Sequence, residues 1–446
     1  IKTLLSQLGK TPFFKNKKPS PYDEAVSLTW FLENVFYNSI SNIYKYIRAN
    51  VFDGKEFNTD IINLGFWPGG DRDGNPFVTT EITLKTATKL RSDIIKNYYR
   101  DIRTLRRRLT FKNIESIIID LESRLYSSIS KFNDEPQISL KELKKKLYNI
   151  REILISEHKS LFLDQLDDVI NKVNIFGYHF ASLDIRQDSR IHNKAFENVL
   201  KKAQQMNITN FNKDYSKLLE IEKIKILSNL KGDIPLDSFD DGLALSTLSS
   251  IRAMKLIQKS NGEKGSNRYI ISNNQSAVNI LEVFSMFRLS DWNFPTVDIV
   301  PLFETVSDLT VAAKVMESVY SNSFYRKHLS NRSDQQTIML GFSDGTKDGG
   351  YLMANWSILK AKESLTAISR KHGIKVVFFD GRGGPPARGG GNTHQFYASM
   401  GTFVESDEIQ LTVQGQTISS NFGTVDSCQY NLEQLLSSGI QNRVLS

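Results

Sequence analysis

The chain has 446 residues, of which 40% are hydrophobic, 11% aromatic and 24% charged, a composition with ample apolar material for a sizeable core. No stretch approaches the roughly 18 uncharged apolar residues of a membrane span, the first residues lack a secretory-signal pattern, and the single cysteine, Cys428, cannot form an internal disulfide. These features argue against a membrane or secreted protein, and we expect a cytoplasmic one.

Up to about residue 175 the sequence has mainly the periodicity of amphipathic helices, as in residues 23–47 and 140–173. One short apolar run, IINLGFW at residues 61–67, interrupts this pattern and leads into the tight loop PGGDRDGNP. We therefore expect a mostly helical region over residues 1–175 that carries one strand and this loop.

The net formal charge of +8 is concentrated in one predicted helix. Residues 85–112 contain ten lysines and arginines against two aspartates, an excess equal to that of the whole chain. Apolar residues spaced by threes, fours and sevens in the same stretch predict an amphipathic helix with a basic outer face. We favour a solvated helix face, and the alternative is a surface for nucleic acid or an acidic partner.

After residue 175, short apolar runs alternate with helical patterns, which predicts parallel βα units. The runs are apolar throughout, as is typical of strands buried on both faces. They lie at residues 180–189, 268–273, 297–305, 337–350, 375–384 and 409–416.

With residues 61–67, the sequence offers seven strands, nearly all ending in polar or charged residues. A (β/α)₈ TIM-type barrel has eight strands and keeps its active site at their carboxyl ends. We predict such a barrel embedded in a predominantly helical protein, with the βα barrel region at 176–446 and a single large domain overall. We expect the remaining strand to lie before Ile1, which would make the sequence a fragment.

Two acidic residues follow consecutive predicted strands. Glu304 comes after VPLF and Asp344 after LGFS. Because neighbouring strand ends lie only ~5 Å apart, two carboxylates there would repel each other unless a cation lay between them. Oxygen ligands of this kind suit Mg²⁺ or Mn²⁺, whereas solvated acids or helix N-caps are the alternative.

The stretch FFDGRGGPPARGGGNTH (residues 378–394) delivers Asp380, Arg382 and Arg388 to the same predicted rim. Its glycines allow backbone amides to approach an anion, and two guanidinium groups can bind phosphate or carboxylate oxygens. An RNA-binding RGG segment is a rival, but it would require many repeats in a low-complexity tract. A glycine-rich turn with solvated arginines is the other alternative.

Further charged groups converge on this rim. Lys347 follows Asp344 closely, and Arg186 arrives from the strand in LDIRQDS. In WPGGDRDGNP, ion pairs within the loop could explain the charges of Asp71 and Arg72 without any ligand. Trp67 could be a core residue or an apolar wall that excludes water. Together, these signals favour a site for a phosphorylated, acidic small molecule.

The ordered motifs FWPGGDRDGNPFVT, LDIRQDS, VPLFET, GFSDGTKDGG and GRGGPPARGGGNTH resemble those of the phosphoenolpyruvate carboxylase family over nearly the whole chain. The resemblance implies a (β/α)₈ barrel with extra helices, a homotetramer, and Mg²⁺ or Mn²⁺ as cofactor. It also implies that phosphoenolpyruvate and bicarbonate are converted, through carboxyphosphate and a metal-stabilised enolate, into oxaloacetate and phosphate.

The resemblance also implies roles for individual residues. Glu304 and Asp344 would bind the metal, Arg382 and Arg388 the transferring phosphoryl group, and Arg186 the phosphate. The remaining expected site residues are Lys347 and Trp67 near bicarbonate, Asp380 among the catalytic groups, and Asp71, Arg72, Gly383 and Gly384 among the substrate-binding groups.

Two departures from the family stand out. Asp380 occupies the position of the histidine in the family's usual FHGRGG, and the family's catalytic TAHP histidine is not found in these residues. They motivate an alternative hypothesis, a non-catalytic homologue that binds an acidic metabolite as a regulatory or assembly subunit.

Overall fold

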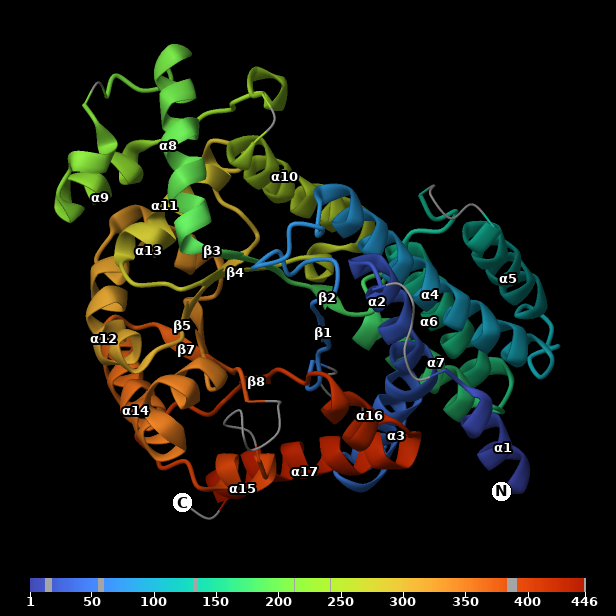
Figure 1. Cartoon of the computed structure of the whole chain (residues 1–446). Coiled ribbons are helices and arrows are strands. Elements are labelled where there is room, and N and C mark those ends of the chain that lie inside the picture. Colours follow the sequence, from blue (N-terminus) through green and yellow to red (C-terminus); the bar gives the residue numbers. More distant parts are fainter. Residues whose placement is uncertain are drawn as a thin grey trace.

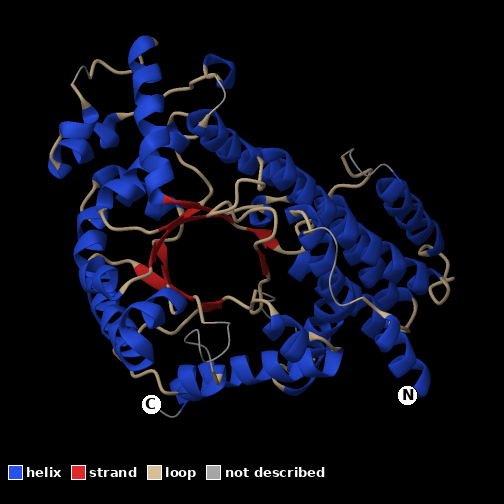
Figure 2. Ribbon diagram, viewed as in Figure 1, coloured by secondary structure: helices blue, strands red, loops and turns tan. Residues whose placement is uncertain are grey.

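The computed structural model describes most of the chain, and its described ranges are residues 1–12, 18–54, 60–130, 135–211, 213–240, 242–382 and 391–444. Within them the protein is a mostly helical α/β structure in which parallel strands surround a common axis (Figures 1 and 2).

The first part of the chain is helical, as predicted. Its helices are α1 (Lys2–Lys10), α2 (Pro21–Phe31), the π-helix η1 (Leu32–Phe36), α3 (Tyr37–Asn50), α4 (Thr80–Arg106), α5 (Glu115–Ser130), α6 (Leu140–Glu157) and α7 (Leu163–Phe176). Local signals begin several of them. At α2, Ser20 and Asp23 form a capping box and Pro21 takes the first helical position, where a missing N–H costs nothing.

The strands follow the predicted order. They are β1 (Gly65–Phe66), β2 (Ser182–Leu183), β3 (Ile185–Asp188), β4 (Arg268–Ser272), β5 (Asp298–Phe303), β6 (Gln335–Leu340), β7 (Lys375–Asp380) and β8 (Ile409–Leu411). β1 pairs with β2, and β3 to β8 form a six-stranded sheet in chain order; each of these pairings is parallel. The predicted parallel βα arrangement is confirmed, and each of the seven predicted runs contains a strand.

Helices alternate with these strands and cover the outside of the sheet (Figure 2). They are α8 (Ser189–Gln205), α9 (Glu220–Asn229), α10 (Leu243–Asn261), α11 (Ala277–Arg288), α12 (Val306–Tyr320), α13 (Ser323–Asn331), α14 (Ser343–Lys371), α15 (Thr393–Ala398), α16 (Gln416–Phe422) and α17 (Val425–Val444). The run predicted over 337–350 contains the end of one strand and the start of a helix, because β6 ends at Leu340 and α14 begins at Ser343. The described pairings do not close an eight-stranded barrel, since β1 and β8 are not paired with each other.

Adjacent residues of the strands belong to different hydrophobic clusters. Ile270 and Leu302 pack in a small inner cluster, whereas Ile271 and Phe303 belong to the large cluster under the outer helices. Burial on both faces explains why the strands are apolar throughout rather than alternating. The inner cluster ends at Trp67, which packs against it.

Several basic side chains of α4 pair with acids of the same region. Lys96 and Arg100 lie 3.3 and 3.5 Å from Glu33. Lys89 pairs with Asp93 at 2.5 Å, and Arg106 pairs with Glu122. These ion pairs agree with the interpretation of this helix as a solvated face that is partly balanced by acids.

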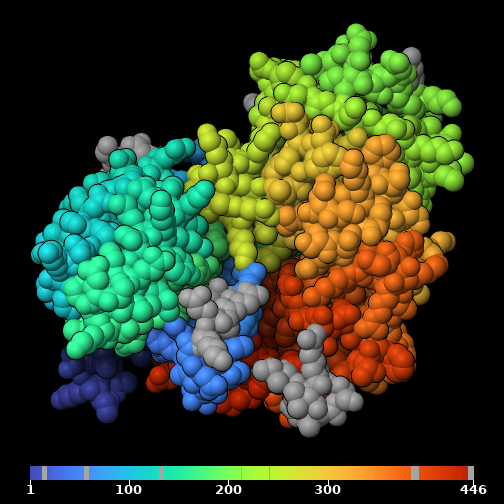
Figure 3. All heavy atoms as spheres, turned by 180° about the vertical axis from the view of Figure 1, so that it is seen from behind, coloured from blue at the N-terminus to red at the C-terminus, as the bar shows by residue number. Residues whose placement is uncertain are grey.

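The last helices return to the N-terminal region. α17 packs beside α3, Phe422 stacks on Phe36 at 5.5 Å between ring centroids, and Cys428 is buried in the same core (Figure 1). Seen from behind, the helices before residue 180 lie to one side and those of the later βα units to the other (Figure 3). Among the described helices, none is both long and apolar enough to cross a membrane.

Candidate functional site

The parallel register brings the carboxyl ends of the strands to one edge. Phe303 is paired with Leu340, and Leu340 with Asp380, so the residues that follow β5, β6 and β7 emerge together. A cation or anion bound at this rim would therefore meet side chains from several βα units.

Arg186, on β3, is clamped to the loop that follows β1. Its Nε and a terminal nitrogen donate to the two carboxylate oxygens of Asp71, at 2.8 and 2.9 Å. Burial opposes the charge, but the hydrogen bonds and charge of Asp71 raise the pKa of Arg186, with smaller contributions from Asp73 and Glu304. Arg186 therefore keeps its positive charge and feels the field of Glu304 on a different strand end.

Trp67 contacts both this arginine and the inner apolar cluster. The Arg186 guanidinium lies 4.9 Å from the centre of the indole, on its face. The indole nitrogen donates to Asp184 at 3.0 Å, and the ring packs edge-on against Phe379. The orientation of Trp67 is thus fixed by one hydrogen bond and by packing, which suits an apolar wall at the rim.

Asp184 is the centre of a buried network that sequence analysis missed. It accepts hydrogen bonds from Trp67 and from Nε of Arg268, the latter at 2.8 Å. Burial raises the pKa of Asp184, although the charge of Arg268 favours the ionised form. Its position inside LDIRQDS, between β2 and β3, was the signal that could have identified it.

Arg72 is hydrogen-bonded to other parts of the protein. It is buried, and its guanidinium donates to the backbone oxygen of Val78 at 3.3 Å and to the backbone oxygen and hydroxyl of Ser246 on α10. These contacts fasten the glycine-rich loop to α10, and the predicted role of Arg72 in substrate binding stays a prediction.

The two predicted metal ligands influence each other. Burial raises the pKa of Glu304 to about 6, and the negative charges of Asp344 and Asp73 act in the same direction. One oxygen of Glu304 accepts from the backbone N–H of Asn273 at 2.7 Å. Asp344 lies in the first turn of α14, where it is exposed and receives Lys347 Nζ at 2.7 Å.

This donor set fits a divalent cation. A carboxylate whose pKa is raised mainly by burial, and further by a second carboxylate, would be stabilised by a positive ion between the two. Within the described ranges, no group of three or more histidine, cysteine, aspartate or glutamate side chains gathers in metal-binding geometry. A site here would therefore use these two acids, with water and substrate as further ligands, as Mg²⁺ often does.

Asp380 and Arg382 stand at the end of β7. Asp380 is completely buried and accepts from Lys362 and from the Tyr397 hydroxyl, each at 2.8 Å. The Arg382 guanidinium lies 4.0 Å from the centre of the Phe396 ring, within cation–π range. The other residues predicted in this stretch, Gly383, Gly384 and Arg388, lie outside the described residues.

Lys362 and Tyr397 were also missed by sequence analysis. Lys362 stands in the middle of the long helix α14, and Tyr397 in the short helix α15. The helical pattern of residues gives no sign that either side chain reaches Asp380, so only the tertiary structure identifies them.

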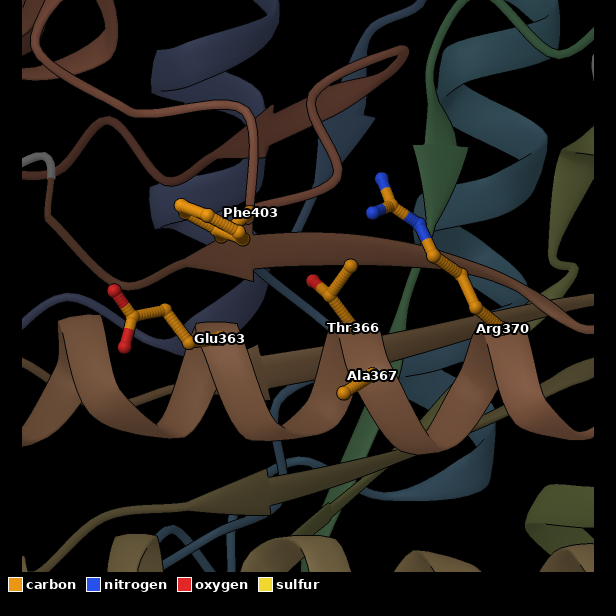
Figure 4. A pocket seen from close by; sticks show the side chains of 5 residues that line it. All are labelled: Glu363, Thr366, Ala367, Arg370 and Phe403. Carbon is orange, nitrogen blue, oxygen red and sulfur yellow. The ribbon is translucent and has the colours of Figure 1, made fainter.

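An open surface pocket lies elsewhere, on the outer face of α14. It is lined by Glu363, Thr366, Ala367, Arg370 and Phe403 (Figure 4). These helix residues are close to the turn that leads into the amino end of β7, whereas the candidate site is at the carboxyl ends of the strands. We therefore do not assign this pocket to the site.

The fold and the rim define an α/β protein with parallel strands that carries paired carboxylates and guanidinium groups at its strand ends. A family model described as phosphoenolpyruvate carboxylase matches residues 1–137 and 121–446. The chain therefore belongs to the phosphoenolpyruvate carboxylase family, as the motifs predicted.

Proposed function

We propose that this protein is a carboxylase that converts phosphoenolpyruvate and bicarbonate into oxaloacetate and phosphate. The observation that carries the proposal is that the charges of Asp344, in the first turn after β6, and of Arg186, on β3, both act on Glu304, which follows β5. A rim with paired carboxylates and a charged guanidinium suits a phosphorylated carboxylic acid together with a divalent cation. Membership of the family supports the same activity.

The arginines would serve the phosphoryl transfer. Transfer of the phosphoryl group to bicarbonate gives carboxyphosphate and an enolate, and charge spreads over the phosphoryl oxygens as this happens. Arg382 and Arg388 would hold that group, and Arg186 would bind the phosphate. Preorganised guanidinium groups lower the barrier most when they already point at the developing charge, and the two hydrogen bonds to Asp71 would fix the orientation of Arg186 for this role.

The remaining residues would organise the second substrate and exclude water. Lys347 and Trp67 would lie near bicarbonate, and Asp71 would act through Arg186. The indole of Trp67, held by Asp184 and Phe379, offers a rigid apolar wall against water that would protonate the enolate.

Glu304 and Asp344 would hold Mg²⁺ or Mn²⁺. When bound, such an ion would supply positive charge that stabilises negative charge developing on a substrate oxygen. The backbone N–H of Asn273 fixes one oxygen of Glu304 and thus the direction of its carboxylate.

We also propose a closed (β/α)₈ barrel, in which β2 and β3 count as one strand and a further strand would pair with β1 and β8. The divisions 1–175 and 176–446 would form one large domain, since α17 packs beside α3 and Asn261 donates to the backbone oxygen of Ala87 at 2.8 Å. A cytoplasmic homotetramer would follow from the family resemblance.

An alternative function is a non-catalytic subunit that binds an acidic metabolite, and the aspartate at position 380 favours it. The two functions differ in one assay of the full-length protein with phosphoenolpyruvate, Mg²⁺ and bicarbonate. Formation of oxaloacetate, followed by its reduction with a coupled dehydrogenase, would support the carboxylase. Phosphoenolpyruvate binding in a calorimeter without any oxaloacetate would support the alternative.

A further inference from the structure

Lys362 is a lysine buried almost completely in the protein. Its side chain is 2% exposed, and its ammonium group lies 2.8 Å from Oδ2 of Asp380, whose side chain is 0% exposed. The rings of Phe378, Phe396 and Tyr397 surround the ammonium, with centroids 5.1, 5.3 and 5.8 Å from Nζ. Burial of a charge this deep is strongly unfavourable unless it is paired, so the two residues depend on each other.

Asp380 also joins the two described flanks of the glycine-rich stretch. It precedes Gly381, and its Oδ2 accepts a hydrogen bond from the hydroxyl of Tyr397, which follows the stretch on α15. Its backbone oxygen accepts from the N–H and the hydroxyl of Thr412, both at 3.1 Å, just beyond β8. Within the described residues, Oδ1 of Asp380 has no hydrogen-bond partner.

Arg382 lies close to this pair. Its guanidinium and the ammonium of Lys362 both approach the ring of Phe396, at 4.0 and 5.3 Å. Its charge also lowers the pKa of the Tyr397 hydroxyl, although burial raises that pKa far more. Asp380 therefore lies near two cations, and the ammonium of Lys362 donates a hydrogen bond to its carboxylate.

We propose that Lys362 is a positioning residue that neutralises the charge of Asp380 beside Arg382, so that the substrate's anionic phosphoryl group is not repelled there. The inference rests on the proposed function. It explains how an aspartate can stand where the family has histidine, because a carboxylate paired with an ammonium has the zero net charge of a neutral imidazole. Without Lys362, the carboxylate would attract Arg382 and repel an anionic ligand.

The test compares Lys362→Met, Asp380→Asn and the double variant in the full-length protein. Lys362→Met leaves a buried carboxylate beside Arg382, and we expect kcat/KM for phosphoenolpyruvate to fall about 30-fold, with a matching loss of affinity in calorimetry. In the double variant the unpaired carboxylate is gone, and we expect kcat/KM to recover about tenfold from its value in Lys362→Met. Asp380→Asn leaves an extra positive charge, so it should weaken phosphoenolpyruvate binding less than Lys362→Met does.

Lys172→Met is the matched control for general destabilisation. Lys172 is also buried, contacts Asp101 and Asp168 at 3.0 and 3.1 Å, and lies over the ring of Tyr37, but it belongs to the helical region. We expect it to lower the melting temperature while the KM for phosphoenolpyruvate stays unchanged. All kinetics are measured well below the lowest melting temperature of the set.

The outcomes separate the two proposals. Two outcomes would overturn the positioning role of Lys362 and leave the proposed carboxylase activity intact. In the first, Lys362→Met loses affinity for phosphoenolpyruvate and the double variant does not recover it. In the second, the two single variants lose equal affinity. If Lys362→Met does not fold, the double variant and Asp380→Asn still test the positioning role. A folded double variant that lacks affinity for phosphoenolpyruvate would contradict it. An original protein that binds phosphoenolpyruvate but forms no oxaloacetate would overturn the carboxylase alone, and one that does not bind it would overturn both.

Discussion

Arg186 and Asp71 face each other with two parallel hydrogen bonds, 2.8 and 2.9 Å long, that tie strand β3 to the glycine-rich loop after β1. The backbone reinforces this contact, since Arg72 N–H donates to the Arg186 oxygen at 2.8 Å and Arg186 N–H donates to Gly70 at 3.1 Å. The guanidinium is thereby held over the face of Trp67, 4.9 Å from the ring centre. Bidentate pairing of this kind fixes orientation as well as charge.

Asp71→Asn should release this orientation. One strong charge-assisted hydrogen bond is lost, so we expect kcat/KM for phosphoenolpyruvate to fall about tenfold, mainly through a higher KM. Steady-state oxaloacetate formation measures the change. Asp60→Asn is the control, because Asp60 pairs with Lys264 at 2.7 Å on the surface, away from the rim. Equal kinetics for Asp71→Asn and the original protein would show that the clamp does not serve the site.

Glu304→Gln and Asp344→Asn should each remove metal affinity. Either change removes a negative ligand from a two-carboxylate site, and we expect Mn²⁺ affinity to fall at least about 100-fold, as measured by the electron paramagnetic resonance of free Mn²⁺. Glu317→Gln serves as the control, since Glu317 is an exposed acid of α12 paired with Lys371 at 2.8 Å. Unchanged Mn²⁺ binding in both site variants would place the metal elsewhere.

Arg382→Ala should reduce oxaloacetate formation by about 10²- to 10³-fold, because a preorganised charge that stabilises the transferring group contributes several kcal/mol. From the sequence alone, we expect a loss of similar size for Arg388→Ala. Arg370→Ala is the comparison, since Arg370 pairs with Glu405 at 3.1 Å on the outer face of α14. Full activity in Arg382→Ala would contradict the assigned role.

Asp184→Asn should destabilise the fold itself. The change leaves the Arg268 guanidinium buried without its counter-charge, so we expect the free energy of unfolding to fall by about 3–5 kcal/mol. Denaturant titration followed by tryptophan fluorescence measures it. The control Asp233→Asn breaks a half-exposed pair with Arg252 and should cost less than about 1 kcal/mol. Similar decreases in the free energy of unfolding of the two variants would mean that the buried Asp184–Arg268 pair stabilises the fold no more than a half-exposed pair does.

Glu282, on α11, should make stability depend on pH. Burial raises its pKa to about 7, although Tyr215 and Asn193 donate to its carboxylate at 2.9 Å and the charge of Lys223 also favours ionisation, while that of Glu197 opposes it. The unfolded chain loses this proton near pH 4.5, so stability should decrease as pH rises from 4.5 to 7 and then level off.

The expected size of this contribution is about 3 kcal/mol. The glutamine in Glu282→Gln cannot ionise, so the free energy of unfolding of this variant should not show the decrease with rising pH. Denaturant titrations of the variant and the original protein between pH 5 and 8 measure the difference. Parallel pH curves for the two proteins would show that Glu282 does not carry the effect.

Much of the fold could be predicted from local pattern. A strand buried on both faces must be apolar at successive positions, and Ile270 with Ile271, or Leu302 with Phe303, leave that mark directly in the sequence. Parallel order followed from the alternation of strands and helices. The residues after β5 and β6 could be placed at one rim because parallel strands bring their carboxyl ends together.

The partners of the charged residues could not be predicted in this way. The sequence presents Arg72 as a candidate substrate ligand and gives no sign that its guanidinium donates to Ser246, 174 residues later. It presents Asp380 as an unexplained acid, whereas the structure places the ammonium of Lys362 against it. The helical periodicity of α14 indicates which of its faces is buried. It gives no information about which carboxylate lies against that face.

The sequence by itself determined the order and kind of the elements, the family, and the residues that reach the strand ends, since these depend on short-range periodicity and on motifs. Only the tertiary structure decided which charges are neutralised internally and which are held toward the rim. The physical reason is that the cost of a buried charge depends on the groups packed around it, and those groups come from distant parts of the chain.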